Sequence, residues 1–265
     1  MKKIISLLIV LCMVFTCATL TACDDESAGQ GNSSKSAAYK ALSAATENTS
    51  KLDSMNAAME MDMTVTVDGV SQSMNILYEI TASGLQGNSP KLRMIMTSDL
   101  PGVNMDIYIA DGWAYATIAG TSYKVSAEDS GFEIEDTAND VIQPLEDDLL
   151  KNVTLKTESD GSQSISLSLK SKDFKDIYDD MIESLLESVS ANGTDLDALE
   201  ISDTNLYIKM SDNYISEYNI DFTMDMTVSG TTAKVEATVC VTFNAPGQNV
   251  TVTPPEGYLS FPSVS

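Results

Sequence analysis

The sequence contains no histidine and only one arginine, and these absences exclude most catalytic chemistry. Without histidine the chain cannot form a Ser-His-Asp or Cys-His system, and it lacks the commonest metal ligand. Arg93 alone offers little with which to clamp a phosphate, and the sequence has no glycine-rich phosphate loop. A pair of carboxylates is the catalytic device that remains. We therefore expect no enzyme activity, no catalytic residues, no metal and no dissociable cofactor, and a carboxylate-based hydrolase is the weakest of three hypotheses.

Basic residues are also scarce, which limits the partners that the chain can have. Among its 265 residues, 39 are acidic and 15 are lysine or arginine, giving a formal net charge of −24. Such a charge repels nucleic acid, so we expect no nucleic-acid partner. Hydrophobic residues make up 43% of the chain, which is too many for a disordered protein and enough for one sizeable domain.

The chain begins with a short apolar segment that is typical of a secretion signal. Lys2 and Lys3 precede a run from Ile4 to Phe15 that is apolar apart from Ser6. This run is about half as long as a helix needs in order to span a bilayer core of about 30 Å. We therefore interpret residues 1–22 as a cleaved signal peptide rather than a transmembrane helix.

The signal ends in Leu20-Thr21-Ala22-Cys23, which resembles the lipobox of bacterial lipoproteins. The resemblance implies that Cys23 carries a covalent diacylglycerol and that the protein lies outside the cytoplasm, anchored to the cell membrane by this lipid. Residues 24–34 hold no large apolar side chain, so we expect residues 23–34 to form a lipid-anchored flexible tether. Cys240 is the only other cysteine after the signal, which excludes an internal disulfide. No break rich in glycine or proline divides residues 35–265, which we interpret as a single domain.

Alternating apolar residues predict β-hairpins at both ends of this domain. Asp68-Gly69 and Ser229-Gly230 each separate two amphipathic runs. A two-residue turn at each position brings the apolar residues of both strands onto one face of the sheet. The expected cross-strand pairs are Met63 with Met74, Met61 with Ile76, Met59 with Tyr78, Met226 with Ala233, Met224 with Val235, and Phe222 with Ala237.

Several further elements are predicted between these two hairpins. A hairpin at Asp111-Gly112 places Tyr108, Trp113 and Tyr115 on the face opposite its aliphatic residues, so we expect it to be covered on both sides. Another hairpin spans residues 153–169, with a three-residue loop at 160–162 that pairs Leu155 with Leu167. Strands are expected near 92–96 and 206–210, and helices at 36–50, within 136–151 and at 171–189. About ten strands and three helices predict an α+β protein whose large antiparallel sheet curls, with helices against one face.

This layout resembles the LolA and LppX/LprG class of envelope lipoproteins. The shared features are the lipobox, the tether, a short helix, many hairpin strands, an aromatic hairpin near Trp113 and Tyr115, and a closing hairpin before a Pro-Pro tail. The resemblance implies that the sheet forms an unclosed half-barrel with the helices on its concave face. It also implies that the apolar space between sheet and helices accepts the acyl chains of a lipid. We therefore expect residues 35–265 to hold or carry a lipid or another apolar small molecule.

Methionine is unusually frequent on the predicted apolar strand faces. Its flexible, polarizable side chain suits a surface that accepts varied apolar ligands. Methionine also fills irregular gaps in an ordinary core, and the sequence leaves both interpretations open. The candidate ligand pocket consists of Met59, Met61, Met63, Met74, Ile76, Tyr78, Met94, Met96, Phe222, Met224, Met226 and Val235.

Other interpretations of the same residues remain. The second hypothesis is a non-catalytic envelope lipoprotein that binds another protein, in assembly, sensing or as a scaffold, without any ligand. Met-x-Met pairs on strands form a soft-donor array that suits Cu(I) in principle. Asp195, Asp197 and Glu200 lack the glycine and spacing of a calcium loop, which favours a solvated approach to a helix. The segment Met-Asp-Met-Thr-Val occurs at 61–65 and again at 224–228, through an internal repeat or through convergence.

Overall fold

The protein is described from a computed structural model, in residues 36–87, 89–100, 102–130, 145, 147–177, 196–228 and 230–264. The predicted signal peptide, Cys23 and the predicted tether lie outside these residues. So do residues 136–144 of the second predicted helix and residues 178–189 of the third.

The described residues form a sheet of twelve strands with helices before and between them. The first part of the chain contains α2 (Ala37–Ser50), β1 (Ser54–Val67), β2 (Val70–Ser83), β3 (Lys91–Ser98), β4 (Met105–Ala110), β5 (Trp113–Ile118), β6 (Thr121–Ser126) and α3 (Ala127–Ser130). The second part contains α5 (Asp147–Leu150), β7 (Lys156–Thr157), β8 (Gln163–Leu169), α6 (Ser171–Ile177), β9 (Leu196–Ile201), β10 (Thr204–Ser211), β11 (Tyr214–Val228), β12 (Thr231–Phe243) and the 3-10 helix η2 (Tyr258–Ser260).

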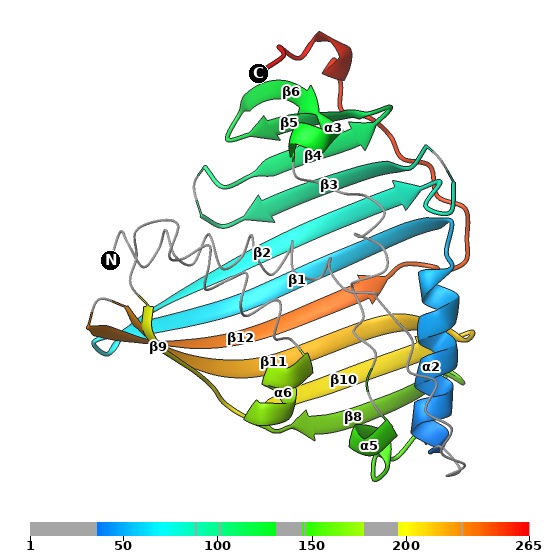
Figure 1. The fold of residues 1–265 in the computed structure, drawn as a ribbon, viewed down its shortest axis with the longest axis vertical. Coiled ribbons are helices and arrows are strands. Elements are labelled where there is room, and N and C mark those ends of the chain that lie inside the picture. The colour runs from blue at the N-terminus through cyan, green and yellow to red at the C-terminus, as the bar shows by residue number, and fades with distance from the viewer. Residues whose placement is uncertain are drawn as a thin grey trace.

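The strands lie in the order β6-β5-β4-β3-β2-β1-β12-β11-β10-β8-β7, and β9 pairs with β11. β6 and β7 are therefore the two ends of an unclosed sheet, in front of which Figure 1 shows α2, α5 and α6. This is the predicted α+β fold, a curled antiparallel half-barrel with helices on its concave face. The sheet has twelve strands rather than about ten, because β6 and β9 were not expected.

The hairpins at the two ends of the domain have the predicted registers. At the first turn, Asp68 and Gly69 have φ angles of 52° and 77°, as a type I′ turn requires. All six expected cross-strand pairs are present in β1–β2 and β11–β12. β1 also pairs with β12 along residues 57–67, so the two hairpins join at the centre of the sheet.

The Met-Asp-Met-Thr-Val segments lie on β1 and β11, which are separated by β12. Met63 precedes its turn at Asp68 by five residues, whereas Met226 precedes its turn at Ser229 by three. Identical segments thus occupy different positions relative to their turns. This difference favours convergence over an internal repeat.

Helix α2 is joined to the sheet at its C-terminal end through one buried hydroxyl. Thr49 Oγ1 donates to the carbonyl of Ala45 at 2.7 Å, and the backbone N–H of Ile215 donates to Thr49 Oγ1 at 3.0 Å. A register shift between Lys209 and Met210 interrupts the β10–β11 ladder close to Ile215. Thr49 therefore satisfies a strand N–H and fixes the helix against β11.

We expect Thr49→Val to lower the free energy of unfolding by about 1–3 kcal/mol, because it leaves the buried N–H of Ile215 without its acceptor. Urea denaturation measures the change. Thr66→Val is the matched control, since the Thr66 hydroxyl bonds only to exposed Ser71 in the described part of the chain. Equal losses in the two variants would contradict this role of Thr49.

The hairpin predicted for residues 153–169 has a different register. Lys156 pairs with Ser164 and Thr157 with Gln163, so the loop spans residues 158–162. The predicted three-residue loop and the pairing of Leu155 with Leu167 are therefore wrong. β7 is also only two residues long, so it pairs with just the first part of β8.

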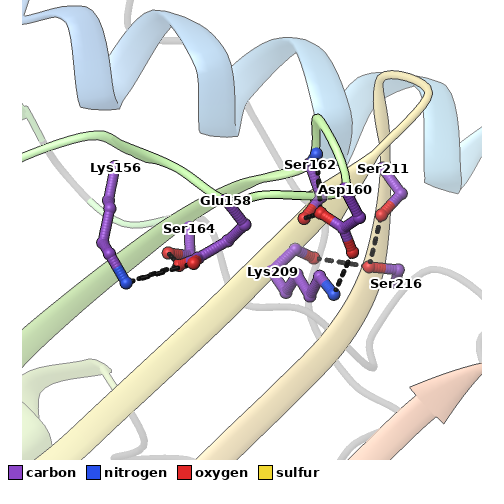
Figure 2. A network of polar contacts seen from close by, with 8 residues as sticks. All are labelled: Lys156, Glu158, Asp160, Ser162, Ser164, Lys209, Ser211 and Ser216. Carbon is purple, nitrogen blue, oxygen red and sulfur yellow. Dashed lines mark hydrogen bonds and ion pairs between the residues drawn. The ribbon is translucent and has the colours of Figure 1, made fainter.

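Side-chain hydrogen bonds in the loop explain the wider turn (Figure 2). Glu158 accepts from Ser164 Oγ at 2.7 Å, and Asp160 accepts from the backbone N–H of Ser162 at 3.0 Å. Asp160 also accepts from Lys209 Nζ on β10 at 2.9 Å. Asp160 also accepts a hydrogen bond from the Ser162 hydroxyl. This bond is the main reason why the pKa of Asp160 lies well below its ordinary value, and the bonds from Lys209 and from the Ser162 N–H lower it further. The polar loop residues, rather than apolar alternation, set the register of this hairpin.

The acidic stretch near residue 200 forms a strand instead of the expected approach to a helix. In β9, Leu199 pairs with Met226 and Ile201 with Met224. Ile201 is buried and Glu200 is exposed, so β9 is amphipathic. The apolar members of β9 extend the face that carries the candidate pocket.

The C-terminal tail covers the outer face of the β4–β5 hairpin at Tyr108 and Tyr115, as predicted, whereas Trp113 remains exposed. Tyr108 and Tyr115 are buried with Val252 in an apolar cluster separate from the main core. The ring of Tyr258 meets these two tyrosines edge-on, at centroid distances of 5.2 and 4.9 Å. Arg93 fixes the tail by donating to the carbonyl oxygen of Thr253 at 2.9 Å.

Tyr258→Ala is expected to lower the pKa values of Tyr108 and Tyr115 toward the ordinary value of about 10. Burial is the main cause of the raised pKa of both phenols, and the neighbouring Tyr258 adds to it. Because folding raises these pKa values, their contribution to stability is present below about pH 10 and is lost as the pH rises further. Absorbance titration of tyrosinate measures the shift, with Tyr39→Phe as control. An unchanged titration curve for the remaining tyrosines would show that the tail does not bury them.

Candidate functional site

All twelve residues of the predicted pocket lie on one face of the sheet, which we call the inner face. They occupy alternate positions on β1, β2, β3, β11 and β12. Each is buried, with exposed fractions from 0% for Tyr78 and Val235 to 8% for Met94. The structure therefore brings the whole predicted set together in one apolar cluster.

Neighbouring members of the set form rows across the strands. Met96, Tyr78 and Met59 lie side by side on β3, β2 and β1. Met74 and Met63 form a second row, which continues through Ala237 to Phe222. Side chains opposite one another in such rows are close enough to interact, so the methionines belong to one continuous apolar surface.

Helices lie against part of this face. Phe174 of α6 stacks on Phe222 of β11 with 6.1 Å between ring centroids. Leu42 of α2 and Leu150 of α5 are buried in the same cluster. In the described residues, α2 contacts β11 and α6 contacts β8, whereas α3 contacts β5 and β6 at the other end of the sheet.

The inner face is larger than the predicted pocket. The cluster also contains residues that the sequence showed as alternating but did not assign to the site, among them Ile107, Ile109, Ile165, Leu206, Ile208 and Met210. No local signal separates these residues from the predicted ones, because both groups follow the same alternation. Only the strand order shows that they share one surface.

The described residues of the inner face are mainly apolar. Apart from tyrosine, the buried polar side chains of the described residues are all serine or threonine: Thr49, Ser54, Ser162, Ser164 and Thr204. The inner-face cluster also contains the buried tyrosines Tyr78 and Tyr218. No carboxylate, lysine or arginine is among the buried residues in the described ranges. A ligand on this face would therefore be held by dispersion and by exclusion of water.

The remaining sequence candidates lie elsewhere. Cys240 is half-buried on the outer face of β12, and burial raises the pKa of its thiol. In the described part of the chain, no group of three or more aspartate, glutamate or cysteine side chains is arranged to hold a metal ion. Asp195, which the sequence analysis considered as a calcium ligand, lies outside that part, as does the predicted anchor Cys23. No helix within the described ranges is long and apolar enough to cross a membrane.

Comparison with known proteins gives one family and several structures. Residues 38–253 match the model of a family described as a family of unknown function, DUF6612. Among curated proteins, none matches the chain. LprF from Mycobacterium bovis is similar over 85% of this chain and 100% of its own, with 12% identity and a TM-score of 0.43.

Two further solved structures are similar to the chain. A LolA superfamily protein from Nitrosomonas europaea matches over 81% of this chain and 96% of its own, with 10% identity and a TM-score of 0.21. A putative outer membrane lipoprotein-sorting protein domain from Vibrio parahaemolyticus matches over 80% and 95%, with 12% identity and a TM-score of 0.25.

Proposed function

The chain belongs to the DUF6612 family, whose function is unknown, and we propose that it is an extracytoplasmic lipoprotein that binds or carries a lipid or another apolar ligand. Cys23 carries the diacylglycerol that anchors it to the cell membrane. The apolar ligand lies between the inner face of the sheet and the helices. The protein acts without catalysis.

One observation supports this proposal, namely the methionine-rich inner face, on which no charged side chain is buried among the described residues. Eight of the twelve pocket residues are methionine, and all eight are buried, six on the adjacent strands β1, β2 and β3 and two on β11. Methionine has no branched carbon and a polarizable sulfur, so such a face can repack around chains of different shape. A core that needs only to be filled gains specificity from branched residues instead.

Native mass spectrometry tests the proposal most directly. Residues 35–265 are purified from a bacterial host without detergent, and bound lipids are extracted and identified. We expect a co-purifying lipid in roughly stoichiometric amount, since removal from an apolar face into water is unfavourable. A clean apo mass, with no uptake from added lipid vesicles, would contradict the proposal and favour a protein-binding lipoprotein.

A further inference from the structure

A row of polar side chains crosses the outer face of the sheet, on the side opposite the methionines. Its six members lie side by side on β2, β1, β12, β11, β10 and β8, because the registers of these strands place them opposite one another. At about 4.8 Å between strands, the row is about 24 Å long. In strand order the members are Asn75, Asp62, Thr238, Asp221, Asn205 and Ser168.

The row passes through two adjoining hollows in the outer surface. The hollows have volumes of about 390 and 400 Å³, and both are lined by Asn205 and Asp221. The exposed residues Asp62 and Thr238 also line the first hollow, and the exposed Ser168 lines the second. The C-terminal tail packs on β4 and β5, several strands away, so it leaves this part of the outer face open. The hollows together form a groove across the strands.

The charges that line the groove exclude an anionic ligand. Four carboxylates line the first hollow, and no lysine or arginine is among the described lining residues of either one. Two of the four carboxylates are already neutralised, since Lys170 pairs with Asp203 and Lys234 pairs with Glu236. The groove thus keeps excess negative charge at Asp62 and Asp221, beside neutral polar groups.

The two remaining carboxylates take their hydrogen bonds from neutral donors. Asn75 Nδ2 donates to Asp62 at 2.9 Å, and Thr238 Oγ1 donates to Asp221 at 2.7 Å. Each carboxylate can accept further hydrogen bonds. Their surroundings therefore suit neutral hydroxyl donors as well as cations.

The second hollow adds an unmet acceptor and an aromatic ring. Asn219 Oδ1 is buried and has no hydrogen-bond donor among the described residues, although its amide nitrogen donates to Glu217 at 2.7 Å. Tyr207, Ser166 and Ser168 line the same hollow. The hollow thus combines acceptors, hydroxyls that both donate and accept, and one planar apolar surface.

We propose that this groove binds a polyhydroxylated chain, a glycan of the cell envelope, through hydrogen bonds to Asp221, Asn205 and Asn219 and contact with the ring of Tyr207. Sugar hydroxyls both donate and accept hydrogen bonds, and the C–H faces of sugar rings pack on aromatic rings. The sugar units of an extended β-linked glycan repeat at close to the spacing of neighbouring strands, which matches a row that advances one strand at a time. This site goes beyond the lipid-binding function and lies on the opposite face of the sheet.

Calorimetric titration of the acylated protein in lipid nanodiscs tests the proposal, with empty nanodiscs as the blank. The probes are short cello-oligosaccharides and chito-oligosaccharides, and pentalysine serves as a cationic competitor. We expect saccharide binding that is weakened by about tenfold or more in Asp221→Ala and in Asn205→Ala, because each variant removes hydrogen bonds made directly to the ligand. The matched control is Asp225→Ala, which removes an exposed carboxylate from the same face of β11 outside both hollows.

Three results would overturn the glycan site. They are the absence of heat with every saccharide, equal weakening in Asp225→Ala, and salt-sensitive binding of pentalysine in place of saccharides. The last result would assign the groove to a cationic peptide. Lipid content measured on the same samples is expected to be unchanged in all three variants, so failure of the glycan site is distinguishable from failure of the lipid-binding proposal.

Discussion

Replacing Cys23 by serine is expected to move nearly all of the protein from the membrane fraction to the soluble extracytoplasmic fraction. In this variant the native signal is also exchanged for one that an ordinary signal peptidase cleaves. Two acyl chains provide stable anchoring, at about 0.8 kcal/mol for each buried CH₂ group. The serine variant loses this anchor, and without Lys2 and Lys3 of the signal its formal net charge is −26 (13 basic against 39 acidic residues), which an anionic lipid surface repels. Cell fractionation followed by immunoblotting measures the redistribution.

The control for this experiment is the wild-type chain with its own signal. Its N-terminal peptide is expected to have the mass of a diacylglycerol-modified cysteine. The exchanged signal in the serine variant matters, because an uncleaved signal would itself hold the chain at the membrane. If the serine variant remains in the membrane fraction after a high-salt wash, the interpretation of Leu20-Thr21-Ala22-Cys23 as a lipobox is wrong.

The parts of the fold that the sequence predicts are those fixed by local chemistry. At Asp68-Gly69, a turn that needs two positive φ angles coincides with alternation on both sides, so only one register keeps every apolar residue on one face. The same holds for Ser229-Gly230 and Asp111-Gly112. In the first two hairpins the expected pairs match the structure residue by residue, and in the third the expected faces do.

The parts that were missed depend on weaker or more distant signals. β6 follows a turn at Ala119 and Gly120, where alanine has a φ of 48°, a conformation that alanine rarely adopts. β9 is short, and its strand partner β11 lies farther along the chain. The β7–β8 loop is held by Asp160 and Glu158 through side-chain hydrogen bonds, which apolar alternation does not reveal.

The two candidate sites also differ in whether local sequence patterns predict them. The methionines of the inner face were predicted, because each strand shows its own apolar alternation. The outer groove was not, because its residues come together only through the long-range pairings of β1 with β12 and of β10 with β8. Asp221 and Asn205 are ordinary exposed polar residues when each strand is considered alone.

The double substitution Met63→Asp with Met226→Asp is expected to abolish lipid binding and, at neutral pH, folding itself. Each methionine is 2% exposed, with Met74 and Ala237 beside Met63 and with Ala233 and Leu199 beside Met226. An unpaired carboxylate buried in such a place costs several kcal/mol, whereas a whole domain is stable by only about 5–15 kcal/mol. Burial raises the pKa of each new carboxyl group, so circular dichroism should show folding regained as the pH falls and the groups become neutral.

A leucine pair at the same two positions distinguishes a ligand surface from a filled core. Met63→Leu with Met226→Leu nearly conserves volume, so it should cost less than about 1.5 kcal/mol per site and keep the fold. Leucine is less adaptable than methionine, so we expect the folded variant to retain less lipid, or fewer kinds of lipid, than the wild type in native mass spectra. Asp225→Asn on the outer face should leave the lipid content unchanged.

An aspartate pair that stays folded and keeps its full lipid complement would place the ligand elsewhere. A change of lipid in the folded leucine pair would assign these methionines to the ligand, because a core that is only filled has no lipid to lose.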